Sequence, residues 1–394
     1  MQTTRLALLG GAAMAVAGSA FAGGVERSLQ SSAILFEEGT YAELGFGRVD
    51  PKASGDLVGP PFSVSTGDML GGENVATFSF KTDLSDRLVG AIVIDKPVGA
   101  EVNYGGDPNN VFDFPGNLDG DHPFAGSTAT LDSKALTAYL RYKFDGGFSV
   151  YGGLRAQQVE GQVSLPSAQG YELETNNDLA YGYVLGAAYE RPDIALRVAL
   201  TYNSAIDHTF DAKETSDIPV PGFDERNGDF ETTIPQSVNL EFQSGIAKDT
   251  LLFGSVRWVD WSEFDINPSL YSDIILQGNP NGITFPLAGY ESDTITYRLG
   301  VGRRFNENWA GAVTLIHEPK TGDIFGNLGP IDGRDAIALG VTYTNDRFKI
   351  SGGVEYSWLG DALSQNPRGL PGDPVSDFQD NTAISYGIRI GYFF

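Results

Sequence analysis

The last eleven residues of the chain alternate between two kinds of side chain. Every second position is apolar and the positions between are mostly small or polar: Ile384, Tyr386, Ile388, Ile390, Tyr392 and Phe394 alternate with Ser385, Gly387, Arg389, Gly391 and Phe393. This period of two indicates a β-strand with one apolar face. A strand tilted by about 45° needs roughly 9–11 residues to cross a bilayer, whereas strands of soluble proteins usually have only about 5–6. The pattern therefore favours a strand that spans a membrane.

The same alternation recurs in three earlier segments, 194–203, 336–343 and 348–358. In each of them the less apolar face consists mainly of Gly, Ala, Ser, Thr and charged residues. A soluble barrel would have to fill its core with that face and would bury charged groups there. A membrane barrel instead turns its apolar face outward to lipid and its polar face inward to a lumen. We therefore predict a transmembrane β-barrel.

Connections of two lengths alternate along the chain. Short turns are predicted at 85–86, 145–147, 191–193, 248–250, 306–308 and 344–346. Long polar loops are predicted at 51–74, 105–129, 165–177, 207–230, 266–291, 320–334 and 361–380. These thirteen connections join fourteen strands, with about 12 or 16 as alternatives, and place both chain ends on the short-turn side, as in bacterial outer-membrane barrels. Aromatic residues near the predicted strand ends would form the two membrane girdles: Tyr139, Tyr142, Tyr202, Trp258, Trp261, Tyr343, Tyr356, Trp358 and Tyr392.

The N-terminus has the composition of a targeting segment. Arg5 precedes the apolar run LALLGGAAMAVAG, and Ala20 and Ala22 stand at the small-residue positions of a cleavage site. Residues 1–22 are therefore predicted to be a signal peptide. Beyond them, no window of about 18 apolar residues without charges follows, so no membrane-spanning helix is expected. Together with the strand pattern, this predicts the outer membrane of a Gram-negative bacterium as the location.

Residues 23–38 do not share the alternation. Val25, Leu29, Ile34 and Leu35 lie near helical spacing, just before the first predicted strand at 40–49. A barrel of this size has a lumen wide enough to leak unless something fills it. The segment is therefore predicted to be a plug, with a frayed terminus as the alternative. The predicted fold class is all-β, a 14-stranded antiparallel transmembrane β-barrel over residues 39–394 with a short N-terminal plug.

Composition and charge remove several classes of function. The chain has no Cys, and its three His residues are far apart, so thiolate sites, disulfides and local His metal motifs are excluded, and neither a metal nor a cofactor is expected. A net charge of −25 disfavours nucleic-acid binding. Acidic loop residues such as Asp361, Asp373, Asp377 and Asp380 could meet lipopolysaccharide through divalent ions. An outer-membrane hydrolase is the enzyme alternative, with His208 beside Asp207 and Asp211 as its candidate, but the prediction is that the protein is not an enzyme.

Two hairpins resemble a known family. The segment IPQSVNLEFQSGIAKDTLLFGSVRWVDWSEF, residues 234–264, and the segment TITYRLGVGRRFNENWAGAVTLIHEPKTGD, residues 294–323, resemble the FadL family of outer-membrane long-chain fatty-acid transporters. The plug-like start and the YGIRIGYFF ending agree with this resemblance. The resemblance implies a 14-stranded barrel with an N-terminal hatch, capture of hydrophobic substrate at extracellular loops, and release by hatch movement or a side opening. It also implies no enzymatic chemistry.

Candidate ligand residues lie in the lumen, the plug and two loops. Six Arg residues fall on the faces assigned to the lumen, where one could bind a fatty-acid carboxylate or pair with Glu190, Glu241 or Glu355 to brace the barrel: Arg141, Arg155, Arg197, Arg257, Arg298 and Arg389. The resemblance implies a capture groove at loops 165–177 and 207–230, with plain solvated loops as the alternative. The ligand-binding candidates are Leu29, Ile34, Leu35, Arg141, Arg197, Arg298, Phe210 and Phe223.

The function predicted first is passive transport of hydrophobic compounds, above all long-chain fatty acids, by a monomer embedded in outer-membrane lipid and lipopolysaccharide. A channel for aromatic or other hydrocarbons is the alternative within the same fold. A general porin for hydrophilic solutes is the alternative with a different function.

Overall fold

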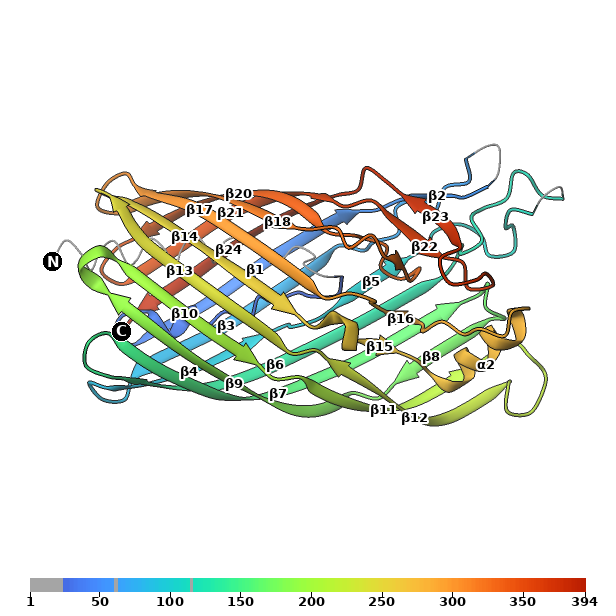
Figure 1. The fold of residues 1–394 in the computed structure, drawn as a ribbon, viewed down its shortest axis with the longest axis horizontal. Helices are drawn as coiled ribbons and strands as arrows, with labels where there is room; N and C mark the ends of the chain where they lie inside the picture. The colour runs from blue at the N-terminus through green and yellow to red at the C-terminus, as the bar shows by residue number, and fades with distance from the viewer. Residues whose placement is uncertain (1–23, 60–62, 114–115) are drawn as a thin grey trace.

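The computed structural model describes residues 24–59, 63–113 and 116–394. The predicted signal peptide at 1–22 lies outside these residues. Within them one closed antiparallel sheet forms a barrel of fourteen strands, four of which are broken into two segments (Figure 1). The predicted fold class is thus confirmed, and β1 closes the barrel by pairing with both β3 and β24.

The barrel strands follow one another around the wall in chain order. Their bounds are β1 (Tyr41–Lys52), β3 (Glu73–Asp83), β4 (Leu88–Asp95) with β5 (Ala100–Asn103), β6 (Thr128–Lys143), β7 (Phe148–Leu165), β8 (Tyr171–Thr175) with β9 (Asp178–Arg191), β10 (Leu196–Asn203) with β11 (Ile206–Thr215), β12 (Glu225–Ile234) with β13 (Ser237–Ala247), β14 (Thr250–Val259), β17 (Thr294–Arg304), β18 (Trp309–Glu318), β20 (Arg334–Thr344), β21 (Phe348–Leu359) and β24 (Thr382–Phe393).

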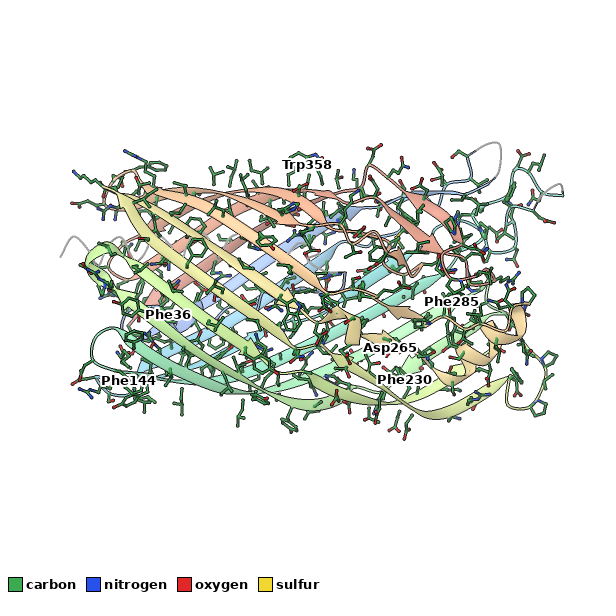
Figure 2. The ribbon with its side chains drawn as sticks, in the orientation of Figure 1. Phe36, Phe144, Phe230, Asp265, Phe285 and Trp358 are labelled. Carbon is green, nitrogen blue, oxygen red and sulfur yellow. The ribbon has the colours of Figure 1, made fainter. Side chains whose placement is uncertain are left out.

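The two faces of the wall are sorted as the alternation predicts. Apolar side chains such as Phe46, Leu339 and Ile388 are exposed on the outside, and Trp358, which is 53% exposed, stands on the outer surface (Figure 2). The residues between them point into the lumen and are buried, and all six candidate Arg residues lie on that side. Lipid is the solvent of the outer face, because it is the only environment that favours so much exposed apolar surface.

All six predicted short turns are present, and they lie at the same end of the barrel as the C-terminus (Figure 1). The opposite end carries the long connections and some additional structure: β2 (Gly55–Leu57), β19 (Ile324–Phe325), β22 (Ala362–Gln365) and β23 (Pro374–Phe378) form a small sheet, and β15 (Asp265–Ile266) pairs with β16 (Ala288–Gly289). A helix, α2 (Ser269–Gly278), also lies at this end, with 3₁₀ turns at η2 (Pro192–Ile194) and η3 (Trp261–Glu263) elsewhere. Among the described residues, no helix is both long and apolar enough to cross a membrane.

Two of the predicted long loops are largely strand. Segments β8, β11 and β12 extend the wall outward through 165–177 and 207–230, which leaves residues 166–170, 176–177 and 216–224 outside the strands. In β11 every second side chain is buried, while Asp207, Asp211 and Lys213 between them face outward and are exposed. Where a wall rises beyond the lipid its outer face is charged, so the apolar alternation that marks a strand in the membrane is lost.

Two of the predicted girdle aromatics point inward instead. Tyr139 is 3% exposed and packs in the lumen, and Trp261 is 1% exposed and packs against Phe264 and Tyr290. Tyr139 pairs with Ala91 and Gly153, whose positions also face the lumen. For Tyr139 the side is therefore determined by parity along the strand and not by position near its end, whereas Trp261 lies in the 3₁₀ turn η3 and not in a strand.

Candidate functional site

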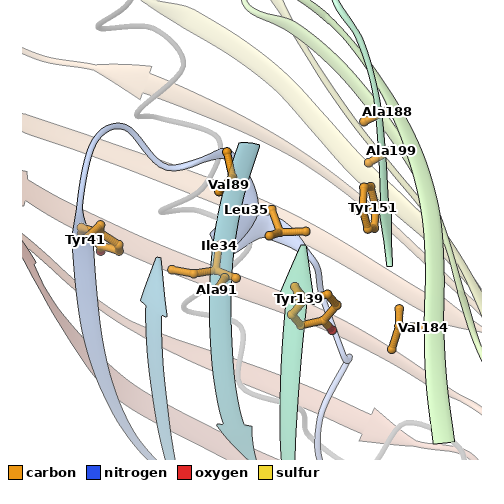
Figure 3. Close-up of a cluster of buried hydrophobic side chains, with 10 residues drawn as sticks. All are labelled: Ile34, Leu35, Tyr41, Val89, Ala91, Tyr139, Tyr151, Val184, Ala188 and Ala199. Carbon is orange, nitrogen blue, oxygen red and sulfur yellow. The ribbon is translucent and has the colours of Figure 1, made fainter. Parts of the chain in front are cut away.

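The N-terminal segment, residues 24–38, lies inside the barrel. Only its part η1 (Ala33–Phe36) is helical, as a single 3₁₀ turn, so the near-helical spacing predicted more helix than forms. Ile34 and Leu35 pack in a buried cluster of lumen-facing side chains that includes Val89, Tyr139 and Tyr151 (Figure 3). Burial of each of these two side chains stabilises the segment by about 1.5–3 kcal/mol.

Two lumen arginines hold the end of the N-terminal segment. The Arg141 guanidinium donates to the Leu35 carbonyl at 3.0 Å, pairs with Glu190 and lies 4.2 Å from the Phe36 ring centroid. The Arg197 guanidinium lies on the same ring at 4.6 Å. Both cations are thus used to position the segment, and the bracing alternative holds for Arg141 and Glu190.

Buried ion pairs fix the beginning of the N-terminal segment. Glu26 pairs with Arg257 of β14, whose Nε donates at 2.8 Å, and Arg27 donates to Glu73 of β3 at 2.5 Å. The Leu29 carbonyl accepts from Asn239 at 2.8 Å. An ion pair removed from water contributes only when both partners are present, and the loss of one leaves a buried charge. These contacts therefore fix the position of the N-terminal segment within the lumen.

The N-terminal segment also completes a gap in the barrel wall. Strand β4 ends at Asp95 and β5 begins at Ala100, with Pro97 between them. The Arg27 amide donates to the Pro97 carbonyl and the Gly99 amide to the Val25 carbonyl, both at 2.8 Å. Proline cannot donate to a sheet, so the wall is interrupted there. Residues 25–27 provide the hydrogen bonds that a continuous strand would have made.

An apolar cavity, here called the outer cavity, lies on the side of the N-terminal segment that faces the long loops. It is lined by Val25 of the segment, by wall residues including Leu131, Val163, Phe210 and Phe230, and by loop residues including Phe264, Leu287, Tyr290 and Leu328. No Asp, Glu, Lys or Arg is among its described lining residues. Tyr290 lies so close to Gly24 that a Cβ on that glycine would be 1.7 Å from the phenol oxygen. The cavity therefore ends directly on the segment.

Helix α2 lies beside the outer cavity and is anchored by a carboxylate from the wall. Glu214 of β11 accepts the backbone N–H groups of Leu270 at 3.0 Å and Tyr271 at 3.0 Å, as well as the Tyr171 hydroxyl at 2.9 Å. A carboxylate at a helix N-terminus satisfies free N–H groups and interacts favourably with the helix dipole. The apolar face of α2 packs on Tyr171, Leu173 and Leu287, of which the last two also line the outer cavity.

A second cavity, here called the inner cavity, lies between the N-terminal segment and the wall. Leu29, Ala33 and Ile34 line it from the segment. Arg298 of β17 also lines it and is 6% exposed. None of the three guanidinium nitrogens of Arg298 has a hydrogen-bond partner among the described residues. Glu355, Glu26 and Glu318 lie within electrostatic range of Arg298, but its buried N–H groups are left without acceptors, which is costly.

The structure places the eight ligand-binding candidates from the sequence in different environments. Leu29, Ile34 and Arg298 line the inner cavity, and Phe210 lines the outer cavity. Leu35, Arg141 and Arg197 hold the N-terminal segment in place instead. Phe223 packs with the α2 cluster and does not line either cavity.

The enzyme candidate does not assemble a catalytic triad among the described residues. His208 is buried, its Nδ1 lies 2.9 Å from Asp178, and its Nε2 has no hydrogen-bond partner there. A hydrolase would require a nucleophile at that nitrogen. Nor do the described residues contain a group of three or more His, Asp or Glu that could hold a metal ion.

Sequence reasoning missed Glu26, Glu214, Tyr290 and helix α2. The signal for Glu214 was the alternation in β11, which places a carboxylate on the buried face together with Phe210 and Ala212. Glu26 and Tyr290 have no comparable signal, because their partners come from distant parts of the chain.

Comparison with known proteins determines the family. A model of the family described as "Outer membrane protein transport protein (OMPP1/FadL/TodX)" matches residues 9–368. The chain belongs to this family. The family consists of outer-membrane β-barrel channels of Gram-negative bacteria that transport hydrophobic compounds, which confirms the predicted location and the general transport function. No curated protein sequence matches the chain.

Solved structures share the fold. A FadL homologue from Pseudomonas aeruginosa superposes with a TM-score of 0.69 at 16% identity, covering 92% of each chain. The toluene transporter TodX of P. putida gives a TM-score of 0.62 at 12% identity, also covering 92% of each chain. The toluene transporter TbuX of Ralstonia pickettii gives 0.57 at 14% identity, covering 92% of this chain and 91% of the other. At these identities the likeness establishes the fold alone.

Proposed function

We propose that this protein carries hydrophobic monocarboxylates, above all long-chain fatty acids, passively across the outer membrane. The observation that carries the proposal is the pairing of a charge-free outer cavity with an inner cavity that contains the unpartnered Arg298. An amphiphile with an apolar tail and a single anionic head matches both environments.

The outer cavity supplies the affinity for an apolar tail. Its aromatic and aliphatic lining offers no charge to be desolvated. Each Å² of apolar surface that leaves water contributes about 25 cal/mol. Capture therefore needs no energy source beyond the hydrophobic effect.

Arg298 supplies a preference for a carboxylate. Its guanidinium can donate two parallel hydrogen bonds to a carboxylate, and hydrogen bonds to charged groups contribute about 1.5–3 kcal/mol. Two other lumen arginines, Arg141 and Arg257, already have carboxylate partners. Among these cations Arg298 is therefore the one available to a ligand.

The outer cavity also supports the alternative substrate class. Phe210, Phe230, Phe264 and Tyr290 surround a space without charge, which suits a neutral aromatic hydrocarbon, and two of the similar structures are described as toluene transporters. The porin alternative has less support, because the N-terminal segment occupies the lumen. Large steady currents from the intact protein in planar bilayers would favour the porin.

The test compares oleate and toluene binding to purified protein in detergent. We expect wild type to bind oleate, and Arg298→Gln to weaken oleate binding by about tenfold or more while toluene binding is unchanged. Arg303→Gln is the matched control, since Arg303 is exposed on the other face of the same strand. Toluene binding with oleate binding that is weak and insensitive to Arg298→Gln would identify an aromatic hydrocarbon channel instead.

The same proposal takes residues 23–38 as the plug and residues 39–394 as the barrel, acting as a monomer. The acidic residues of the long connections, such as Asp361 and Asp377, would contact lipopolysaccharide through divalent ions.

A further inference from the structure

The outer cavity contains a polar side-chain group that the fold does not use. Four polar residues are among its described lining residues: Thr130, Gln162, Thr175 and Tyr290. Thr130 and Gln162 are exposed at positions of β6 and β7 that face away from the lumen. The Thr175 hydroxyl already accepts from the Gly161 amide at 2.9 Å and donates to the Gly161 carbonyl at 3.3 Å. The Tyr290 hydroxyl is therefore the polar side-chain group that the cavity can offer to a ligand.

The Tyr290 hydroxyl lies where the outer cavity meets the N-terminal segment. Gly24 of the segment has a φ of +63°, and its lack of a Cβ admits the phenol oxygen. The Val25 amide donates toward the same oxygen. The Tyr290 ring packs on Trp261 and Phe264 at centroid distances of 5.3 and 5.8 Å. The hydroxyl is thus held in place from both the ring and the segment.

Empty space lies on another side of the Tyr290 hydroxyl. Gly329 also lines the outer cavity, and a Cβ on it would have only the Tyr290 hydroxyl oxygen within 4 Å, at 3.8 Å. Gly329 is not among the glycines with a positive φ, so neither its backbone nor its packing requires glycine. Ordering a glycine costs more backbone entropy than ordering any other residue. Gly329 therefore leaves room beside the hydroxyl that a ligand can fill and that the fold does not need.

The Tyr290 hydroxyl is a hydrogen-bond donor in search of an acceptor. Burial raises the pKa of Tyr290 from the ordinary 10 to about 12, so the hydroxyl keeps its proton at neutral pH. In the part of the chain that the structure describes, no side chain or carbonyl accepts this proton. A phenol oxygen that accepts from an amide can still donate its own O–H. The atom that would complete this contact is an acceptor oxygen.

We infer that Tyr290 holds the oxygen-bearing end of a ligand in the outer cavity by donating a hydrogen bond to it, while the apolar body of the ligand lies along residues such as Leu131, Val163 and Leu328. The ligand class is a hydrophobic molecule with an acceptor oxygen at one end, as in a fatty acid, its ester or a phenol. For the fatty acid the inference rests on the proposed function. Unlike Arg298, Tyr290 recognises an oxygen that carries no charge.

This contact determines which hydrophobic molecules the outer cavity prefers. A site that donates a hydrogen bond to its ligand discriminates against an analogue without the acceptor, because the buried donor is then left unpaired. Cavities lined mainly by apolar side chains fix the orientation of a ligand by a few such polar groups. The oxygen-bearing end of the ligand therefore lies beside the N-terminal segment, at Tyr290.

The test removes the hydroxyl oxygen and nothing else. Tyr290→Phe is compared with Tyr271→Phe, the matched control, because Tyr271 of α2 belongs to the same long connection and lines neither cavity. Binding of oleate, methyl oleate, p-cresol and p-xylene to purified protein in detergent is measured. The last two probes have nearly the same size and differ by a hydroxyl in place of a methyl group. Arg298→Gln is measured in parallel to separate charge from hydrogen bonding.

We expect Tyr290→Phe to weaken binding of oleate by about tenfold or more, and of methyl oleate and p-cresol by about threefold or more, with p-xylene unchanged. Tyr271→Phe should behave as wild type. Arg298→Gln should weaken oleate binding alone, because the other probes carry no charge.

A second variant tests the space beside the hydroxyl. Gly329→Val fills it and should weaken binding of methyl oleate, whereas Gly105→Val should not, because Gly105 lines neither cavity and a Cβ on it would meet nothing within 4 Å. Methyl oleate binding that is unaffected by Gly329→Val would overturn the placement of the ligand at Tyr290.

Unchanged binding of oleate and methyl oleate in Tyr290→Phe would overturn the inference, and the proposed function would stand if Arg298→Gln still weakens oleate binding. Equal weakening of p-xylene, or the same losses in Tyr271→Phe, would also overturn it, because the effect would then be structural. If wild type binds p-cresol and p-xylene but not oleate, the proposed substrate fails, and the response of p-cresol to Tyr290→Phe still decides the inference. If wild type binds none of the probes, both proposals fail.

Discussion

The Glu26 carboxylate and the Arg257 guanidinium form a buried ion pair between residues 231 positions apart in the chain. Both side chains are almost wholly removed from water, and Arg257 also donates to Asn239 at 2.6 Å. The pair joins the N-terminal segment to β14 at the level where the segment separates the two cavities.

Glu26→Ala tests this pair. Removing one partner of a buried pair costs about 3–5 kcal/mol. Here the loss destabilises the placement of the N-terminal segment in the lumen and leaves the pairing of the barrel strands intact. We expect a folded barrel with increased conductance to small ions in planar bilayers. Glu38→Ala is the control, because Glu38 is exposed at the other end of the segment, and its conductance should equal that of wild type. Equal conductance of all three proteins would show that Glu26 does not hold the segment.

Deletion of residues 23–38 tests the plug itself. The strands pair through their own backbones, so we expect the barrel to fold, hydrophobic uptake to be abolished and small polar solutes to leak. Uptake assays, together with sensitivity of the cells to hydrophilic antibiotics, measure both effects. Normal uptake without leakage would mean that one of the long connections occludes the lumen instead.

Glu214→Gln tests the anchor of α2. The neutral amide is a weaker acceptor for the N–H groups of Leu270 and Tyr271, and losing such a cap costs about 0.5–2 kcal/mol. We expect the amides of α2 to exchange hydrogen faster, by a factor of about 2–30, while those of β14 do not change. Glu225→Gln, on the exposed face of β12, should leave α2 unaffected. If exchange in α2 does not respond to Glu214→Gln, packing alone holds the helix.

His122 predicts a pH-dependent loop. Its Nε2 lies 2.9 Å from the Ser376 hydroxyl, its ring stacks on Tyr104, and burial lowers its pKa from the ordinary 6.5 to about 4. While the loop that carries His122 is packed as in this structure, the buried imidazole is neutral. Protonation of His122 therefore favours conformations in which the loop has left this packing. The contribution to stability is complete above pH 6.5 and is lost as the pH falls from there toward 4.

Hydrogen exchange of residues 104–113 and 116–127 measures this effect. We expect faster exchange at pH 5 than at pH 7 after correction for intrinsic rates, and no such difference in His122→Gln. His317→Gln should retain the difference, because His317 is exposed and paired with Asp335 elsewhere. A pH response that survives His122→Gln would assign it to another group.

The alternation of apolar and polar residues predicted the barrel wall well, because the side of the wall to which a residue points follows from its position within its own strand. The positions of Arg141 and Arg298 on the lumen side followed from parity alone. Their different roles could not be predicted, because the partner of Arg141 is Glu190 on a strand two places along the wall, whereas Arg298 has no hydrogen-bond partner among the described residues. Which arginine lacks a hydrogen-bond partner depends on the packing of the closed barrel and not on the residues next to that arginine in the sequence.

Helix α2 shows a second limit. Its ten residues are few for a helix that must be stable alone, and no side chain of its own caps its N-terminus. The cap comes from Glu214, 56 positions before Leu270. The sequence of a loop cannot indicate a helix whose stability depends on a carboxylate from another strand.

The contacts of the N-terminal segment also determine when it can settle during assembly. Its hydrogen-bond partners include Asp95 on β4, Tyr151 on β7, Glu241 on β13 and Lys349 on β21, so they are spread over almost the whole length of the chain. Contacts between residues so far apart form late, since each must first overcome the entropy of closing a long loop. The N-terminal segment therefore reaches its place only after the strands around it have paired, and until β21 has joined the wall the growing barrel has an open lumen.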